Sequence, residues 1–106
     1  MTLTELFSNP SRWCQDYLAK EKSGKGVNPS DKYAVSWCLG GGLIKCYPDL
    51  PVWLKSEVQH RINAYLRVDS FVTWNDNPER TIEDIQKVAK VIDELIEDMK
   101  AERGIE

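Results

Sequence analysis

The chain has little basic charge, no long apolar run and no cationic N-terminal segment. Its 14 Lys and Arg against 17 Asp and Glu give a net charge of −3 and a pI of about 5.2. Because dedicated nucleic-acid binders are usually basic, a nucleic-acid partner is not expected. No apolar run approaches the roughly 20 residues of a membrane span, and Met1–Pro10 contains Glu5, so we expect no membrane partner and no signal peptide.

Histidine is almost absent, and the three cysteines have no metal-binding spacing. Cys14, Cys38, Cys46 and His60 form no CxxC or HxxxH pattern. On one continuous helix, Cys38 and Cys46 would be about 12 Å apart, too far for one zinc ion or a disulfide. Cysteines on apolar stripes are usually inert, which argues against a Cys/His nucleophile. We therefore expect no metal, no cofactor, and a reducing, cytoplasmic compartment.

The most apolar stretch is residues 33–47, and it contains three consecutive glycines, Gly40–Gly42. Its apolar residues recur at spacings of three and four, which predicts one continuous, mostly buried helix. Each interior glycine costs about 0.5–1 kcal/mol relative to alanine, so we expect another helix or a large ring to pack on the glycines. Two alternatives stay open: a helix that ends at Leu39 before a glycine loop, and a phosphate-binding loop, although the GK[ST] ending is missing.

The remaining patterns also favour helices. Asn9-Pro10 and Asn28-Pro29 place a capping residue before a proline, and Thr81 with Asp84 forms a capping-box pattern. The polar segment 20–27 is expected to be a loop. The sequence therefore predicts an all-α domain covering residues 1–106, a compact orthogonal or bundle-like array with short extra turns. Its four main helices are expected at about 10–19, 31–46, 51–67 and 82–102.

The clearest polar cluster is Trp74-Asn75-Asp76 followed by Arg80-Thr81. In a structural interpretation, Asn75 or Asp76 bonds turn amides, Asp76 pairs with Arg80, and Thr81 caps the last helix. In a functional interpretation, Asp76 and Arg80 flank a ligand or a partner, and polar residues of the first helix join them. This gives a candidate ligand or partner site with no catalytic residue: Gln15, Asp16, Trp74, Asn75, Asp76 and Arg80.

Several motifs in this order resemble a family of small uncharacterised bacterial and phage proteins. The motifs are Trp13-Cys14-Gln15, Ala34-Val35 with Trp37-Cys38, the glycines before Leu43, Trp74-Asn75-Asp76, and Arg80-Thr81. They are similar to the family's WCQ, AVxWCxxGAL, WND and RT pattern over most of the chain. The chain departs from the pattern in two ways. It has Gly41 where alanine or another small residue is expected nearby, and its last helix is longer. The resemblance implies a single compact domain and assigns no catalytic residue.

These features predict a non-enzymatic protein-interaction module. The special case is a phage-encoded or bacterial regulator or inhibitor of a host protein complex. The alternative is a small ligand-binding protein or enzyme with a cleft near the Trp74–Arg80 cluster. A third hypothesis is a homo-oligomer formed through the long last helix, whose acidic and lysine-bearing outer face is otherwise expected to be solvated.

Overall fold

Helices and a small sheet together make up the structure, a computed structural model that describes residues 1–104. The two-stranded sheet is antiparallel. The all-α prediction is therefore wrong, and the described part of the chain has a mixed α/β fold. In chain order the elements are α1 (Leu3–Leu6), the 3-10 helix η1 (Pro10–Arg12), β1 (Ala19–Glu21), β2 (Ala34–Trp37), α2 (Leu39–Cys46), α3 (Val52–Leu66), α4 (Phe71–Asn75) and α5 (Ile82–Arg103).

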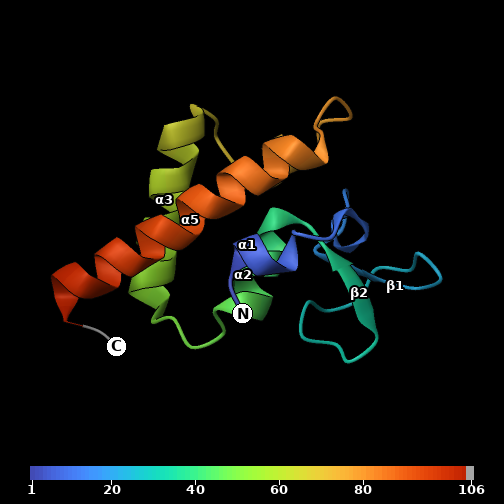
Figure 1. Cartoon of the computed structure of the whole chain (residues 1–106), viewed down its shortest axis with the longest axis horizontal. Coiled ribbons are helices and arrows are strands. Elements are labelled where there is room, and N and C mark those ends of the chain that lie inside the picture. The colour runs from blue at the N-terminus through green and yellow to red at the C-terminus, as the bar shows by residue number, and fades with distance from the viewer. Residues whose placement is uncertain (105–106) are drawn as a thin grey trace.

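The last helix, α5, runs along the length of the molecule, and the other elements gather around it (Figure 1). In this view α3 crosses α5 on one side, α1 and α2 lie near its middle, and the β1–β2 sheet lies on the side away from α3. The sheet therefore lies at one end of a helical body, and Ala19 of β1 and Trp37 of β2 belong to the same core. No helix within residues 1–104 is both long enough and apolar enough to cross a membrane.

The two long helices lie where periodicity placed them, within one residue at each end. The capping box that starts α5 is present: Thr81 Oγ1 accepts from the Asp84 amide at 3.3 Å, and Asp84 Oδ2 accepts from the Thr81 amide at 2.9 Å. The helix ends at Gly104, whose φ of 66° is left-handed. Its apolar stripe is buried inside the chain, so it offers little free apolar surface for self-association.

The predicted continuous helix over 31–46 is wrong, because its first part is strand β2. Ala34–Trp37 pairs with β1 in the register Ala19↔Trp37 and Lys20↔Ser36. A valine and a tryptophan in this short segment suit a pleated strand, and their partner lies far away in sequence. The helix starts only after Cys38, whose sulfur accepts from the Gly41 amide at 3.3 Å. The segment 28–31 makes turns before β2 and starts no helix.

All three glycines lie inside α2, so neither glycine-loop alternative is correct. A Cβ on Gly41 would overlap the carbonyl oxygen of Leu18, and one on Gly42 would lie 3.0 Å from the Phe7 ring. The prediction that glycine permits a close approach is confirmed. At Gly42 the predicted large ring is present, and it is that of Phe7. At Gly41 the prediction is wrong, because the neighbour is the backbone of Leu18, in the bend just before β1.

The predicted helix over 10–19 is also wrong. Asn9 does cap, since its Oδ1 accepts from the Ser11 amide at 3.0 Å, but the helix it starts is only η1. Trp13 then forms a parallel bridge with Trp37, and Asp16 has a left-handed φ of 73°. These long-range pairings replace the helix. They also place part of the predicted 20–27 loop in β1.

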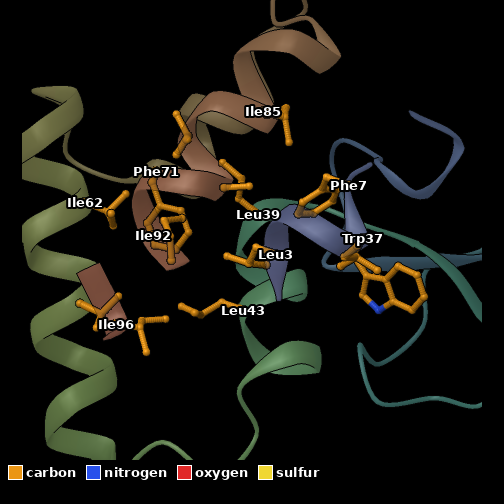
Figure 2. Packing of buried hydrophobic residues seen from close by; sticks show 14 of the residues in the cluster. Leu3, Phe7, Trp37, Leu39, Leu43, Ile62, Phe71, Ile85, Ile92 and Ile96 are labelled. Carbon is orange, nitrogen blue, oxygen red and sulfur yellow. The ribbon is translucent and has the colours of Figure 1, made fainter. Parts of the chain in front are cut away.

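The core lies where α1, α2, α3, α4 and α5 meet. Figure 2 shows Leu3 of α1, Phe7 just after it, and Leu39 and Leu43 of α2 facing the interior, with Trp37 of β2 beside them. Phe71 of α4 is buried in the core, and Val72 and Trp74 are partly buried against it. Asp93 of α5 binds the start of α1 and the residue after α2 through hydrogen bonds. It accepts from the amides of Leu3 and Thr4 at 2.9 and 2.8 Å, and from the Tyr47 hydroxyl at 2.7 Å.

Candidate functional site

Asn75, at the end of α4, is the centre of a buried hydrogen-bond network. Its Oδ1 accepts from Trp13 Nε1 and from the Leu39 amide, each at 3.0 Å. Its Nδ2 donates to the Cys14 carbonyl oxygen at 3.2 Å and to Asp76 Oδ1 at 2.9 Å. A carboxamide has two donor hydrogens and one acceptor oxygen with two lone pairs, and all are in use here. Because Asn75 is also fully buried, its side chain is committed to holding the segment 13–16, α2 and α4 together.

Gln15 and Asp16 join this Asn75 network from the segment after η1. Gln15 Nε2 donates to the carbonyl oxygens of Asn75 at 3.0 Å and Asn77 at 2.8 Å. The Asp16 amide donates to Asp76 Oδ1 at 2.9 Å. Four of the six candidate site residues are therefore bound to one another, as the sequence suggested. The bonds they make are internal ones that shape a loop.

Trp74 and Arg80 form the remaining pair. Arg80 Nε donates to the Trp74 carbonyl oxygen at 2.9 Å, and the guanidinium carbon lies 4.1 Å from the centroid of the Trp74 ring. This is a stacked, hydrogen-bonded arginine. The predicted ion pair of Asp76 with Arg80 is wrong: within residues 1–104 both salt bridges are made by Glu57. Asp76 instead accepts from two N–H groups of the Asn75 network.

An open hollow of about 510 Å³ lies beside this pair, between the end of α3, α4 and the segment before α5. We call it the Trp74–Arg80 hollow. Sequence reasoning found the two residues that name it and missed the others. The available signal was the mostly polar stretch Arg67-Val68-Asp69-Ser70, which begins at the last residue of the helix predicted over 51–67. This stretch contributes Arg67, Asp69 and Ser70 to the lining of the hollow, and α4 contributes Thr73.

A second hollow, of about 650 Å³, lies on the β1–β2 hairpin and was missed entirely. Tyr33 and Val35 form its apolar part and are 63% and 49% exposed. Lys22 and Lys32 line it as well, and the Lys32 ammonium lies 5.1 Å from the Tyr33 ring centroid. Sequence analysis had placed both apolar residues in a buried helix, so their exposure could not be foreseen. We call this the hairpin hollow.

No family model, curated protein or solved structure matches this chain. The resemblance to a family of small bacterial and phage proteins therefore stays a prediction. The motifs that carry it do meet in space, because Trp13-Cys14-Gln15, Leu39 and Asn75-Asp76 all belong to the Asn75 network. The first and the Trp74-Asn75-Asp76 motif are thus joined by hydrogen bonds in this chain.

The cysteines do not gather into a metal site. Within the described residues, no group of three potential His, Cys, Asp or Glu ligands is close enough to hold an ion. Cys14 and Cys38 are buried, and loss of solvent raises the pKa of both thiols. Burial, with a smaller contribution from Asp93, raises the pKa of Cys46 to about 11. His60 is exposed on α3.

Alkylation should report these raised pKa values. At pH 8 a thiol with a pKa of about 11 is about a thousandth ionised, so Cys46 should react with iodoacetamide about two orders of magnitude more slowly than an unfolded thiol. Cys14 and Cys38 should react no faster because they are also buried. Mass spectrometry of native and denatured protein measures the three rates. Rapid labelling of one cysteine in the native protein would reveal an activated thiol.

Proposed function

We propose that the chain is a non-enzymatic protein-interaction module that docks an acidic segment of a partner protein in the hairpin hollow. The observation that carries the proposal is the exposure of Tyr33 and Val35 side by side in a hollow flanked by Lys22 and Lys32. Tyrosine is enriched at protein interfaces and among the residues that contribute most binding energy, and Val35 enlarges the apolar surface beside it. A side chain of the partner that fills this hollow would cover both residues.

The charge of the hairpin supports an acidic occupant. Residues 17–35 contain four lysines but only Glu21 and Asp31 as acidic residues, in a chain whose net charge is −3. Glu21 also lines the hollow and keeps its charge while its carboxylate accepts from the Ser23 hydroxyl at 2.6 Å, so Lys22 and Lys32 outweigh it by one charge. The hairpin is therefore a locally positive end of an acidic molecule. Such a surface attracts an acidic segment and disfavours a basic one.

The cellular setting is part of the same proposal. Three free cysteines favour a reducing compartment, so we place the interaction in the cytoplasm of a bacterium or of a phage-infected cell. In that setting the module would act as a regulator or inhibitor of a host protein complex. Its activity would be to occupy an acidic surface, with no chemical step.

Affinity capture with a matched pair of variants tests the proposal. The double variant Tyr33→Ser with Val35→Ser removes the apolar part of the hollow, whereas Tyr65→Ser removes a ring on α3 that is similarly exposed, at 57%. A partner identified by mass spectrometry should then be purified and titrated against each protein. We expect an acidic partner whose Kd rises about 30-fold for the double variant, from a loss of about 2 kcal/mol, and changes little for Tyr65→Ser.

Salt and charge reversal provide the second readout. Lys22→Glu with Lys32→Glu should weaken the same complex and reduce its dependence on ionic strength. A partner that binds the wild type and the double serine variant equally would overturn the proposal. A basic partner, or one whose binding depends on Tyr65 instead, would overturn it as well.

A further inference from the structure

We propose that the Trp74–Arg80 hollow is a binding site for the phosphoryl group of a small molecule. It shares no residue with the hairpin hollow. Two arginines, Arg67 and Arg80, line it together with the hydroxyl-bearing residues Ser70 and Thr73. Guanidinium and hydroxyl groups are the side-chain donors that proteins use most for phosphate oxygens.

Arg80 is held in a fixed orientation at this site. Its Nε is used by the Trp74 carbonyl oxygen, and its guanidinium plane is stacked on the Trp74 ring. Within residues 1–104 its two terminal nitrogens form no hydrogen bond or salt bridge. An arginine that is fixed at Nε and has both terminal nitrogens free is preorganised to donate a bidentate pair of hydrogen bonds to an oxyanion.

Arg67 contributes the second positive charge from the end of α3. It follows the last residue of the helix and has a left-handed φ of 58°. A side chain in this conformation costs about 1 kcal/mol relative to glycine. Glycine at position 67 would therefore be more favourable for the backbone than arginine is. It is exposed, so its guanidinium has the freedom to close on a ligand.

The hollow contains one opposing charge, that of Asp69. Asp69 is exposed, and its carboxylate forms no salt bridge within the described residues. Two cations and one anion leave the hollow net positive. The same arrangement predicts that removal of the Asp69 charge strengthens binding of an anion, a change that unfolding of the protein cannot mimic.

NMR titration of the ¹⁵N-labelled chain tests the site with three probes: inorganic phosphate, adenosine monophosphate and succinate. We expect phosphate to cause saturable shifts at the amides of Ser70 and Thr73, with a Kd of about 10 mM or below. Adenosine monophosphate binding more tightly than phosphate would identify a nucleotide as the source of the phosphoryl group. Succinate controls for charge alone and should bind more weakly than phosphate.

Two variants separate the site from general effects. Arg67→Gly removes a guanidinium while relaxing the backbone, so it should weaken phosphate binding at least about tenfold without loss of thermal stability. Asp69→Asn should tighten binding. Phosphate shifts centred on the hairpin lysines, equal binding of succinate, or full affinity in Arg67→Gly would each overturn the proposal. Failure of this proposal leaves the proposal for the hairpin hollow standing, because that one is tested with a protein partner and with substitutions at other residues.

Discussion

Replacement of Gly41 by alanine should destabilise the protein by at least about 4 kcal/mol, enough to unfold a chain of ordinary stability. The added methyl group would overlap the Leu18 carbonyl oxygen, and it would lie 2.7 Å from the carbonyl carbon and 3.2 Å from the α-carbon. All three atoms are backbone, so no side-chain rotation relieves the overlap. The same Leu18 oxygen accepts from the Cys38 amide at 3.2 Å, which holds it in place.

Gly40→Ala is the matched control for this prediction. Both substitutions gain about 1 kcal/mol of helix propensity, and they are neighbours on α2. At Gly40 the nearest atom is the Val72 Cγ2, 2.9 Å away, which is the end of a side chain and can shift. We expect this variant to remain within about 2 kcal/mol of the wild type. Urea unfolding followed by circular dichroism measures both, and equal stabilities would show that the β1 segment does not press on α2.

Long periodic helices were predictable from this sequence because their signal is local. In α5 the apolar stripe, the Thr81–Asp84 capping box and the terminal Gly104 agree with one another over more than 20 residues. Residues 31–38 gave an equally apolar pattern, but their structure depends on a partner. Ala34–Trp37 is a strand because β1 and Trp13 lie on either side of it, and no local spacing encodes that pairing.

The candidate site shows the same division. Asn75 and Asp76 stood out as polar residues in a connector, and their grouping with Gln15 and Asp16 was correct. The structural interpretation, in which they bond backbone amides, is supported by the amides of Leu39 and Asp16. The burial of Asn75 was not visible, since it follows from the tertiary meeting of three segments. The Trp-Cys dipeptides at residues 13–14 and 37–38 lie side by side, because the Cys14 amide donates to the Trp37 carbonyl oxygen at 3.0 Å and Trp13 bridges to Trp37.

Loss of the Asn75 side chain is expected to be the other large effect. Asn75→Ala would leave Trp13 Nε1, the Leu39 amide and the Cys14 carbonyl oxygen without their partner. Each buried group left unpaired costs about 1–3 kcal/mol, so a total of about 4 kcal/mol is expected. The matched control is Asn9→Ala. Asn9 also accepts two hydrogen bonds, both from Ser11, but in an exposed cap, where about 1 kcal/mol is typical.

Substitution of Asn75 by aspartate distinguishes hydrogen-bond geometry from mere space filling, because its effect should depend on pH. The new carboxylate would keep the acceptor for Trp13 and Leu39 but would face the Cys14 carbonyl oxygen and Asp76 Oδ1, to which Nδ2 now donates. Burial and these oxygens should raise the pKa of the introduced group above its usual value of about 3.9.

The folded variant then holds its proton at pH values where the unfolded chain has lost it. Its stability should therefore fall as pH rises above about 4, and the full deficit should be present at pH 7. Acidification from pH 7 to about 4 should bring its urea midpoint back toward that of the wild type measured at each pH. A deficit that stays constant over this range would mean that the carboxylate has moved to solvent. The three-segment junction at Asn75 would then be looser than its four hydrogen bonds indicate.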